Sequence, residues 1–173
     1  MLREVISKKE ILKKVKELAQ KIDKDYKNEP IVLIGTLKGA FIFLADLVRF
    51  LKNPNIQIDF VRVKSYGTSD TSSEKVEITK DLEISIEGKN VILIEDIVDT
   101  GITLKFLYEH LKKFNPKSLK ICALIDKKER RKVNIPIDYK GFEIEKGFLV
   151  GYGLDFAENY RHLPEIKEVI KNE

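Results

Sequence analysis

Three carboxylates and two hydroxyls follow a short apolar run near the middle of this 173-residue chain. Residues 91–94 are apolar without alternation, as in a strand buried on both faces, and Glu95, Asp96 and Asp99 come after them. The next residues, before a new helical pattern, are Thr100, Gly101, Ile102 and Thr103. A glycine-containing loop at a helix N-terminus suits a phosphate, whereas the carboxylates suit ribose hydroxyls, magnesium or a proton in transfer. The pattern predicts a site for a phosphorylated sugar at the carboxyl end of a central strand.

A second apolar run, residues 31–34, ends in a loop that contains a cation. Leu37, Lys38 and Gly39 occupy this loop, and an apolar helix is predicted over residues 41–51. A lysine between loop glycines can meet an anion, although the segment lacks the G-x-x-x-x-G-K-[ST] pattern of a Walker-type loop. Taken alone, the segment would favour a plain loop with an exposed lysine. Beside the first motif, it indicates a second anion-binding loop.

Two later segments also carry candidate groups. The apolar run of residues 119–125 ends in a charged stretch that begins Asp126, Lys127, Lys128. Most of that stretch is typical of a solvated turn. Phe148 and Leu149 lead through two glycines to Asp155, and Arg161 follows shortly after. For Phe148, packing in the core is the competing interpretation, because aromatic side chains are usually buried.

The ordered residues 95–103 resemble the phosphoribosyl-pyrophosphate (PRPP) binding motif of the type I phosphoribosyltransferases. For an isolated acidic pair, an ordinary strand–helix turn would be the better interpretation, but the whole pattern favours the family. With the other motifs in the expected order, the chain resembles the purine-specific, hypoxanthine-guanine branch of that family. Two departures are Ile102, where relatives often have lysine, and Glu74, where they often have glycine.

The resemblance implies roles for the residues around PRPP. The loop from Thr100 to Thr103, with Gly101 and Ile102, would hold the 5′-phosphate, and Glu95 and Asp96 would bind the ribose directly or through Mg²⁺. Asp155 would hold a second Mg²⁺. The pyrophosphate would be bound by Leu37, Lys38, Gly39 and Arg161.

The resemblance also implies a purine site and a lid. Lys127 would donate to the 6-oxo oxygen of the purine, Phe148 would stack on the ring, and the backbone of Leu149, together with Asp155, would complete the purine site. Asp99 would act as the general base toward the purine. A polar stretch that starts at Ser65 and Tyr66 and runs to residue 73 would close over the site.

The strands and helices expected to position these residues are mixed along the chain, which predicts an α/β fold. Ser7 and Glu10 match a capping box before a helix, and residues 56–66 read as a long strand with a bulge or twist. Residues 76–78 and 82–86 alternate like a strand hairpin, and a helix is expected over 104–114. The final elements are an edge strand over 135–142, containing Pro136, and a short helical turn or strand over 164–170. The resemblance implies the type I phosphoribosyltransferase fold: a central parallel sheet flanked by helices, with a small hood and a flexible lid, as a single domain over residues 1–173.

Composition limits the remaining possibilities. The net charge is +4 with mixed signs along the chain, which suits small anionic substrates without requiring nucleic acid. Cys122 is the single cysteine, so no internal disulfide can form. No apolar stretch approaches the roughly 18 residues of a membrane span, and no signal-peptide core is present, so we expect a cytoplasmic protein without a membrane partner. A xanthine-preferring enzyme, or a regulator that binds nucleic acid, remains an alternative. The resemblance further implies a homodimer or homotetramer.

Overall fold

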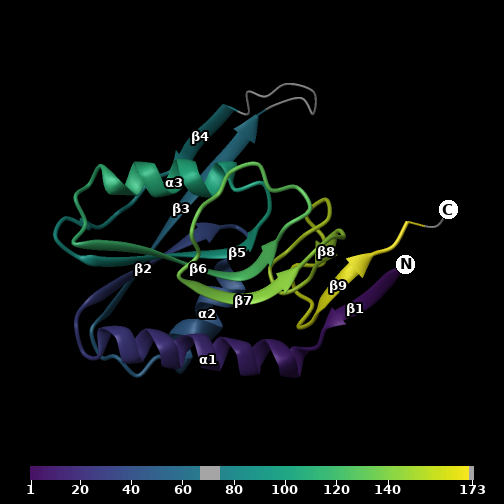
Figure 1. The fold of residues 1–173 in the computed structure, drawn as a ribbon, viewed down its shortest axis with the longest axis horizontal. Helices are drawn as coiled ribbons and strands as arrows, with labels where there is room; N and C mark the ends of the chain where they lie inside the picture. The colour runs from purple at the N-terminus through teal and green to yellow at the C-terminus, as the bar shows by residue number, and fades with distance from the viewer. Residues whose placement is uncertain (67–74, 172–173) are drawn as a thin grey trace.

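The computed structural model describes residues 1–66 and 75–171, which form two β-sheets and three α-helices (Figure 1). The larger sheet has six strands in the order β4-β3-β2-β5-β6-β7. Their bounds are β2 Ile31–Leu37, β3 Ile56–Tyr66, β4 Lys75–Lys80, β5 Asn90–Val98, β6 Ser118–Lys127 and β7 Tyr139–Ile144. Strands β3, β2, β5, β6 and β7 are parallel, and β4 pairs antiparallel with β3. The predicted parallel α/β sheet is therefore confirmed.

The helices cover both faces of this sheet, which explains the uninterrupted apolar runs. Helices α1 (Lys8–Tyr26) and α2 (Phe41–Phe50) lie on one face, and α3 (Ile102–Lys112) lies on the other (Figure 1). In β5, Ile92 and Ile94 pack toward α1 and α2, whereas Val91 and Leu93 pack toward α3. The capping box at Ser7 is present, with both of its hydrogen bonds. Alternate residues of the central strands thus supply two separate cores.

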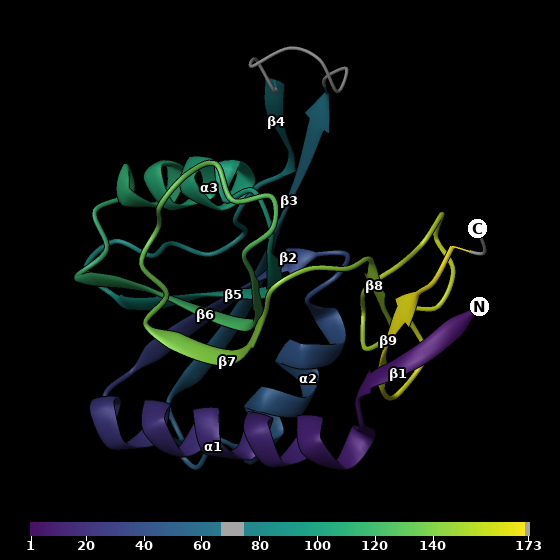
Figure 2. The same cartoon turned by 45° about the vertical axis from the view of Figure 1, so that its right-hand side comes forward.

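A second sheet stands beside the carboxyl ends of the central strands (Figure 2). Its order is β1-β9-β8, all antiparallel, with β1 Leu2–Ile6, β8 Leu149–Val150 and β9 Ile166–Val169. We refer to this sheet, with the connecting residues 151–165, as the hood. The tail therefore forms a strand, one of the two predicted possibilities, whereas pattern reading did not predict β1. Its partner strand β9 lies at least 160 residues away in the chain, so no local pattern predicts the pairing.

The structure corrects several predicted boundaries. Residues 82–86 alternate like a strand but form none, because the N–H groups of Glu83 and Ile84 donate to the buried carboxylate of Asp59. Pro136 lies outside β7, although β7 is the predicted edge strand. Phe114 lies beyond the end of α3 and is exposed. The pairing of β3 with β4 shifts register between Arg62 and Val63, which agrees with the predicted bulge or twist in this strand.

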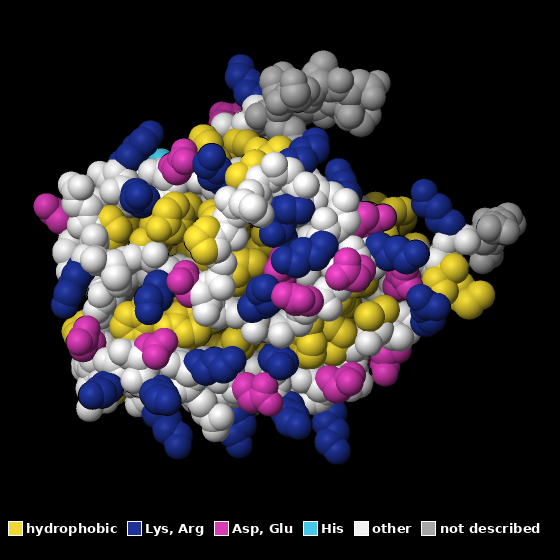
Figure 3. Space-filling view, in the orientation of Figure 1, with side chains coloured by type: hydrophobic (Ala, Val, Ile, Leu, Met, Phe, Trp, Pro, Cys, Tyr) yellow, Lys and Arg dark blue, Asp and Glu magenta, His cyan; other side chains and the backbone are white. Residues whose placement is uncertain are grey.

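The predicted lid falls mostly outside the described residues. Ser65 and Tyr66 form the end of β3, and Tyr66 is half exposed. Residues 67–73 of the predicted lid are not described. Positive and negative side chains are interspersed over the face shown in Figure 3. None of the described helices has the length and apolar character needed to cross a membrane.

Candidate active site

The predicted chemical groups gather where the parallel strands end. Strands β2, β5 and β6 run in the same direction, so Leu37, Val98 and Lys127 end at one edge of the sheet. The hood stands beside this edge (Figure 2). The carboxyl edge of an open α/β sheet is the usual place for a ligand.

The loop between β5 and α3 forms a hollow of about 170 Å³. Gly101 has φ of +85° at the N-cap of α3, and a Cβ there would lie 2.7 Å from the carbonyl oxygen of Val133. Only glycine therefore fits without strain. The Ile102 N–H donates to Thr100 Oγ1 at 3.3 Å. The hollow is lined by Glu95, Ile97, Val98, Asp99, Thr100, Gly101, Thr103 and Leu104, so the predicted loop surrounds it except for Ile102.

Glu95 and Asp96 form a strongly interacting acidic pair at the end of β5. Burial raises the pKa of Glu95 well above its usual value, and the neighbouring charge of Asp96 raises it further, against a hydrogen bond from Thr36. Burial also raises the pKa of Asp96. The Asp96 carboxylate fills the space beside Gly39, where a Cβ would lie 1.9 Å from Asp96 Oδ2. The acidic pair therefore contacts the predicted pyrophosphate loop directly.

Asp99 and Lys127 face each other across the end of the sheet. Lys127 Nζ lies 4.0 Å from Asp99 Oδ1 and 3.8 Å from Glu129 Oε2, and Arg130 Nη1 lies 3.4 Å from Asp99 Oδ2. Asp99 Oδ1 is buried and has no hydrogen-bond partner among the described residues. Lys127 is itself only 6% exposed. The carboxylate thus keeps one free acceptor beside a buried ammonium group.

Arg131 ties the ends of β5 and β6 together. Its guanidinium donates to the carbonyl oxygens of Asp99 at 2.9 Å, Val98 at 3.3 Å and Lys127 at 3.2 Å, and to the carboxylate of Asp126. Asp126 is 1% exposed. Although burial raises its pKa, hydrogen bonds from Lys128, Arg131 and Lys140 bring the pKa down to about 2. Lys128, Glu129 and Arg130 are exposed, as the solvated-turn interpretation expects, although Arg130 also faces Asp99; the interpretation is wrong for Arg131.

The hood supplies the opposite wall of a cavity of about 220 Å³. Phe148 is 50% exposed and meets Phe156 edge to face at 5.5 Å between centroids, so the core-packing alternative is wrong for Phe148. Leu149 is buried in β8. The cavity is lined by Asp96, Ile97, Asp99, Lys127, Arg130, Phe148, Leu149, Leu154 and Asp155. It meets the phosphate-loop hollow at Ile97 and Asp99, which line both.

The predicted pyrophosphate residues lie between β2 and the hood. The Leu37–Lys38 peptide is cis. Lys38 Nζ donates to Glu158 Oε2 at 2.6 Å, and Arg161 Nη2 donates to Glu158 Oε1 at 2.9 Å. Arg161 also donates to the Gly153 carbonyl at 2.7 Å and lies 3.5 Å from Asp155 Oδ1. The structure thus brings both predicted cations to a single carboxylate.

A family model described as the phosphoribosyl transferase domain matches residues 3–157. The chain belongs to the phosphoribosyltransferase family. It is 51% identical over 173 residues to the hypoxanthine-guanine phosphoribosyltransferase of Dictyostelium discoideum, with 98% of this chain and 96% of that protein covered. This agrees with the branch of the family indicated by its motifs.

Similar solved structures belong to the same family. A hypoxanthine-guanine phosphoribosyltransferase from Bacillus anthracis is 49% identical and superposes with a TM-score of 0.92 over 97% of this chain and 98% of that one. A hypoxanthine phosphoribosyl transferase from Trypanosoma cruzi, solved in work on its C-terminal region, oligomeric state and activity, is 41% identical with a TM-score of 0.91 over 97% and 91%. The type I phosphoribosyltransferase fold is therefore confirmed.

Sequence reasoning missed several residues at the site of this phosphoribosyltransferase. Arg131 could not be distinguished in the sequence from the neighbouring charged residues of its run, which are exposed. Glu158 gave no signal, since an isolated glutamate in a polar loop is ordinary. Gly153 has a contact that only the fold reveals: a Cβ there would lie 2.0 Å from the Gly39 carbonyl oxygen. The hood and the pyrophosphate loop therefore meet with no room for a side chain.

The carboxylates of this phosphoribosyltransferase fit Mg²⁺ by their chemistry. Among the described residues, no three acidic, histidine or cysteine side chains form a ready-made metal cage. Mg²⁺ ordinarily takes one or two carboxylates and completes its shell with water and substrate phosphates. Glu95 and Asp96 provide two such groups, and burial, the main cause of the raised pKa of each, is a cost that a bound cation would offset. Asp155 lies apart, with its carboxylate engaged by the Glu158 N–H and near Arg161.

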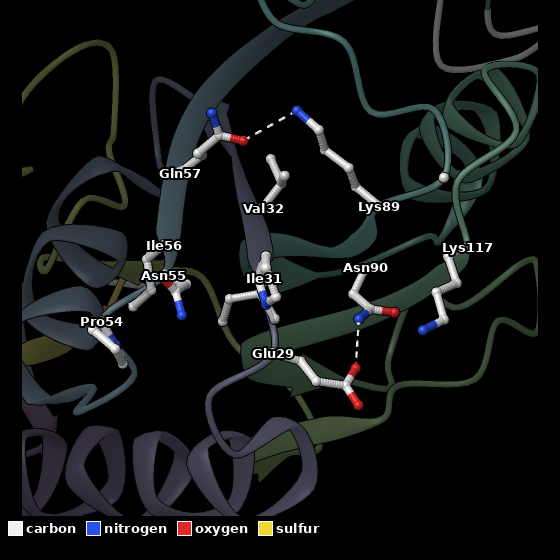
Figure 4. Close-up of a pocket in the computed structure, with 12 residues that line it drawn as sticks. Glu29, Ile31, Val32, Pro54, Asn55, Ile56, Gln57, Lys89, Asn90 and Lys117 are labelled. Carbon is white, nitrogen blue, oxygen red and sulfur yellow. Dashed lines mark hydrogen bonds between the residues drawn. The ribbon is translucent and has the colours of Figure 1, made fainter.

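A larger cavity, of about 620 Å³, lies at the amino ends of the strands and is separate from these groups (Figure 4). Several of its polar side chains bond one another: Asn90 donates to Glu29 at 3.0 Å and Lys89 to Gln57 at 3.1 Å. None of the predicted site residues lines it. A choice of candidate site by cavity volume alone would therefore have pointed to the opposite end of the sheet from the predicted residues.

Proposed function

We propose that this phosphoribosyltransferase transfers the 5-phosphoribosyl group of PRPP to N9 of hypoxanthine or guanine, giving IMP or GMP and pyrophosphate in purine salvage. The main support is the pairing of Asp99 and Lys127, 4.0 Å apart, in a cavity walled by the half-exposed Phe148. A 6-oxopurine offers an oxo acceptor for the lysine and a protonated ring nitrogen for the carboxylate. The adjoining hollow of the phosphate loop would receive the 5′-phosphate.

The proposed reaction breaks the bond between ribose C1 and the pyrophosphate oxygen. The ribosyl group gains cationic character as this bond lengthens, by analogy with glycosyl transfer. The leaving pyrophosphate gains negative charge, which Lys38 and Arg161 would stabilise. Glu95 and Asp96 would hold the ribose hydroxyls. The phosphate loop would fix the other end of the substrate through backbone N–H groups and the hydroxyls of Thr100 and Thr103.

The purine must lose a proton as N9 attacks. Asp99 would accept it from, or orient, the N7 position, a role worth about 10²–10⁴-fold in rate. Its free Oδ1 is the acceptor that this role requires. Lys127 would donate to the 6-oxo oxygen, and Phe148 would stack on the ring with the backbone of Leu149 at its edge. Water would be excluded by the lid that begins at Ser65 and Tyr66.

Mg²⁺ is proposed as the cofactor: Glu95 and Asp96 would hold the ribose directly or through one Mg²⁺, and Asp155 would hold a second. When bound, it would neutralise charge on the pyrophosphate oxygens. We also propose that residues 1–173 act as one domain in the cytoplasm and as a homodimer or homotetramer. The T. cruzi relative, whose C-terminal region was studied for its role in oligomeric state, supports assembly in this group of proteins.

One assay tests the proposal. The protein, Mg²⁺ and PRPP are mixed in turn with hypoxanthine, guanine, xanthine and adenine, and both pyrophosphate and nucleotide are measured. Product from hypoxanthine or guanine, with little from adenine, is expected, because the Lys127 ammonium can donate to an oxo group but not to an amino group. Preference for xanthine would change the assigned base. No product from any base would favour a regulator.

A further inference from the structure

The predicted pyrophosphate site already contains an anion supplied by the chain. Glu158 accepts from Lys38 Nζ at 2.6 Å through one oxygen and from Arg161 Nη2 at 2.9 Å through the other. These two cations are the side chains that pattern and family resemblance assign to pyrophosphate. The Glu158 side chain is 62% exposed, so it bridges them at the mouth of the site and not in the core.

The backbone holds Glu158 in this place at some cost. Phe156 and Asn159 exchange both backbone hydrogen bonds, at 3.1 and 3.0 Å, around a two-residue turn. The two residues in the turn, Ala157 and Glu158, have φ of +49° and +65°. Asparagine and glycine are the residues that such turns prefer, because side chains disfavour positive φ. The Glu158 N–H donates to Asp155 Oδ2 at 2.9 Å, which fixes the turn against the site.

Lys38 and Arg161 are paired with Glu158, and Arg161 still has a hydrogen-bond donor available for a larger anion. Hydrogen bonds from Lys38 and then Arg161 lower the pKa of Glu158, as expected for a carboxylate that remains ionised between two positive groups. Arg161 Nε is buried and has no partner among the described residues, so one donor of this side chain is unused. Pyrophosphate has more charge and more oxygens than a carboxylate and can engage all of these donors together.

We propose that Glu158 is the internal counter-anion of the pyrophosphate site: it aligns Lys38 and Arg161 before substrate binds, and pyrophosphate must displace it. This inference rests on the proposed function, which assigns pyrophosphate to these two cations. Because Glu158 competes with the phosphate groups, it weakens their binding and aids release of the product. Glu158 is a positioning residue, since it acts through the two cations.

Direct binding tests the proposal. Pyrophosphate is titrated by calorimetry, with Mg²⁺ present, into the wild type, Glu158→Gln and Glu158→Ala, and the inhibition constant of pyrophosphate is measured in the forward reaction. Both variants should bind pyrophosphate about 3- to 10-fold more tightly, the amount expected for removing two competing solvent-exposed ion pairs. Glu83→Gln is the matched control, because Glu83 is also exposed and paired with a lysine, Lys80 at 3.5 Å, but lies outside the site.

The change in affinity shows whether Glu158 competes with pyrophosphate for the two cations. Equal or weaker binding of pyrophosphate by both variants would overturn the proposal, because it would show that Glu158 does not compete with pyrophosphate for Lys38 and Arg161. In the Lys38→Met background, Glu158→Gln should produce a smaller gain, since one of the two competing pairs is already gone. Wild-type formation of nucleotide is measured alongside. If the wild type forms none from any purine, the proposed function fails; if it forms nucleotide and the variants bind no more tightly, only the counter-anion role fails.

Discussion

Replacing Arg131 by methionine should destabilise the protein and slow catalysis together. Arg131 donates to the buried Asp126 carboxylate and to three carbonyl oxygens at the ends of β5 and β6. The fall in the pKa of Asp126 from 3.8 to about 2 corresponds to about 2.4 kcal/mol, shared with Lys128 and Lys140. Adding the lost carbonyl bonds gives an expected loss of about 3 kcal/mol in the free energy of unfolding. For a chain of this size, Tm should fall by about 6–12 °C.

The same substitution should lower kcat more than it raises the KM for PRPP. Arg131 holds the backbone of Asp99 and Lys127, and a misplacement of about 1 Å at such groups can cost on the order of 100-fold in rate. Stability is measured by urea unfolding and thermal melting, and turnover by release of pyrophosphate. Arg49→Met is the control, because Arg49 is 73% exposed and pairs only at the surface, so its removal should cost less than about 1 kcal/mol.

Acid titration gives an independent check on this network. Because the folded pKa of Asp126 is lowered, its contribution to stability is complete above the ordinary value of 3.8 and is lost as pH falls toward about 2. The wild type should therefore lose stability across that interval, and Arg131→Met should lose less there. A loss below about 1 kcal/mol at neutral pH with unchanged turnover would refute the reasoning, since the arginine would then be an ordinary surface residue.

Three further substitutions test the rest of the site. Asp99→Asn should keep PRPP affinity but reduce turnover about 10²–10⁴-fold, measured by pyrophosphate release, because a general base is lost. Lys127→Ala should weaken selection of 6-oxopurines more than binding of PRPP, measured by comparing KM values across four bases. Gly153→Ala should raise the KM for PRPP, because the new Cβ would lie 2.0 Å from the Gly39 carbonyl at a φ of +99°.

Each of these has a result that would contradict it. Wild-type rates in Asp99→Asn would remove the general-base role. An unchanged preference among bases in Lys127→Ala would move recognition of the oxo group elsewhere. Gly153→Ala with normal stability and a normal KM would show that the hood can shift without disturbing the pyrophosphate loop.

Local pattern was sufficient for the central strands and for the motif at the end of β5. A parallel strand buried on both faces must be apolar at consecutive positions, so residues 31–34, 91–94 and 121–125 can be recognised from the sequence alone. The strands extend beyond these runs: β6 continues to Lys127 and carries that side chain to the site. Residues 82–86 show the opposite failure, because Asp59 takes N–H groups that a strand partner would need.

The resemblance to the family could also be recognised from the residues alone, because the order and type of the side chains in 95–103 match the PRPP-binding motif. The exposure of Phe148 was not readable. An aromatic residue before a buried pair is typical of core packing, yet half of the Phe148 side chain is exposed in the folded chain.

The sequence by itself indicated which loops are suited to bind anions and which strand ends carry the carboxylates, since these depend on residues that are neighbours in the chain. The tertiary structure decided which charges meet. Lys38 and Glu158 are 120 residues apart, and Arg131 reaches Asp99 across 32 residues. Such contacts form only when the parallel strands end at one edge and the hood closes beside them. The order of the acidic residues at the end of β5 therefore indicates their chemistry from sequence alone, whereas the contacts of Arg131 and the placement of Glu158 between two predicted pyrophosphate ligands come from the fold.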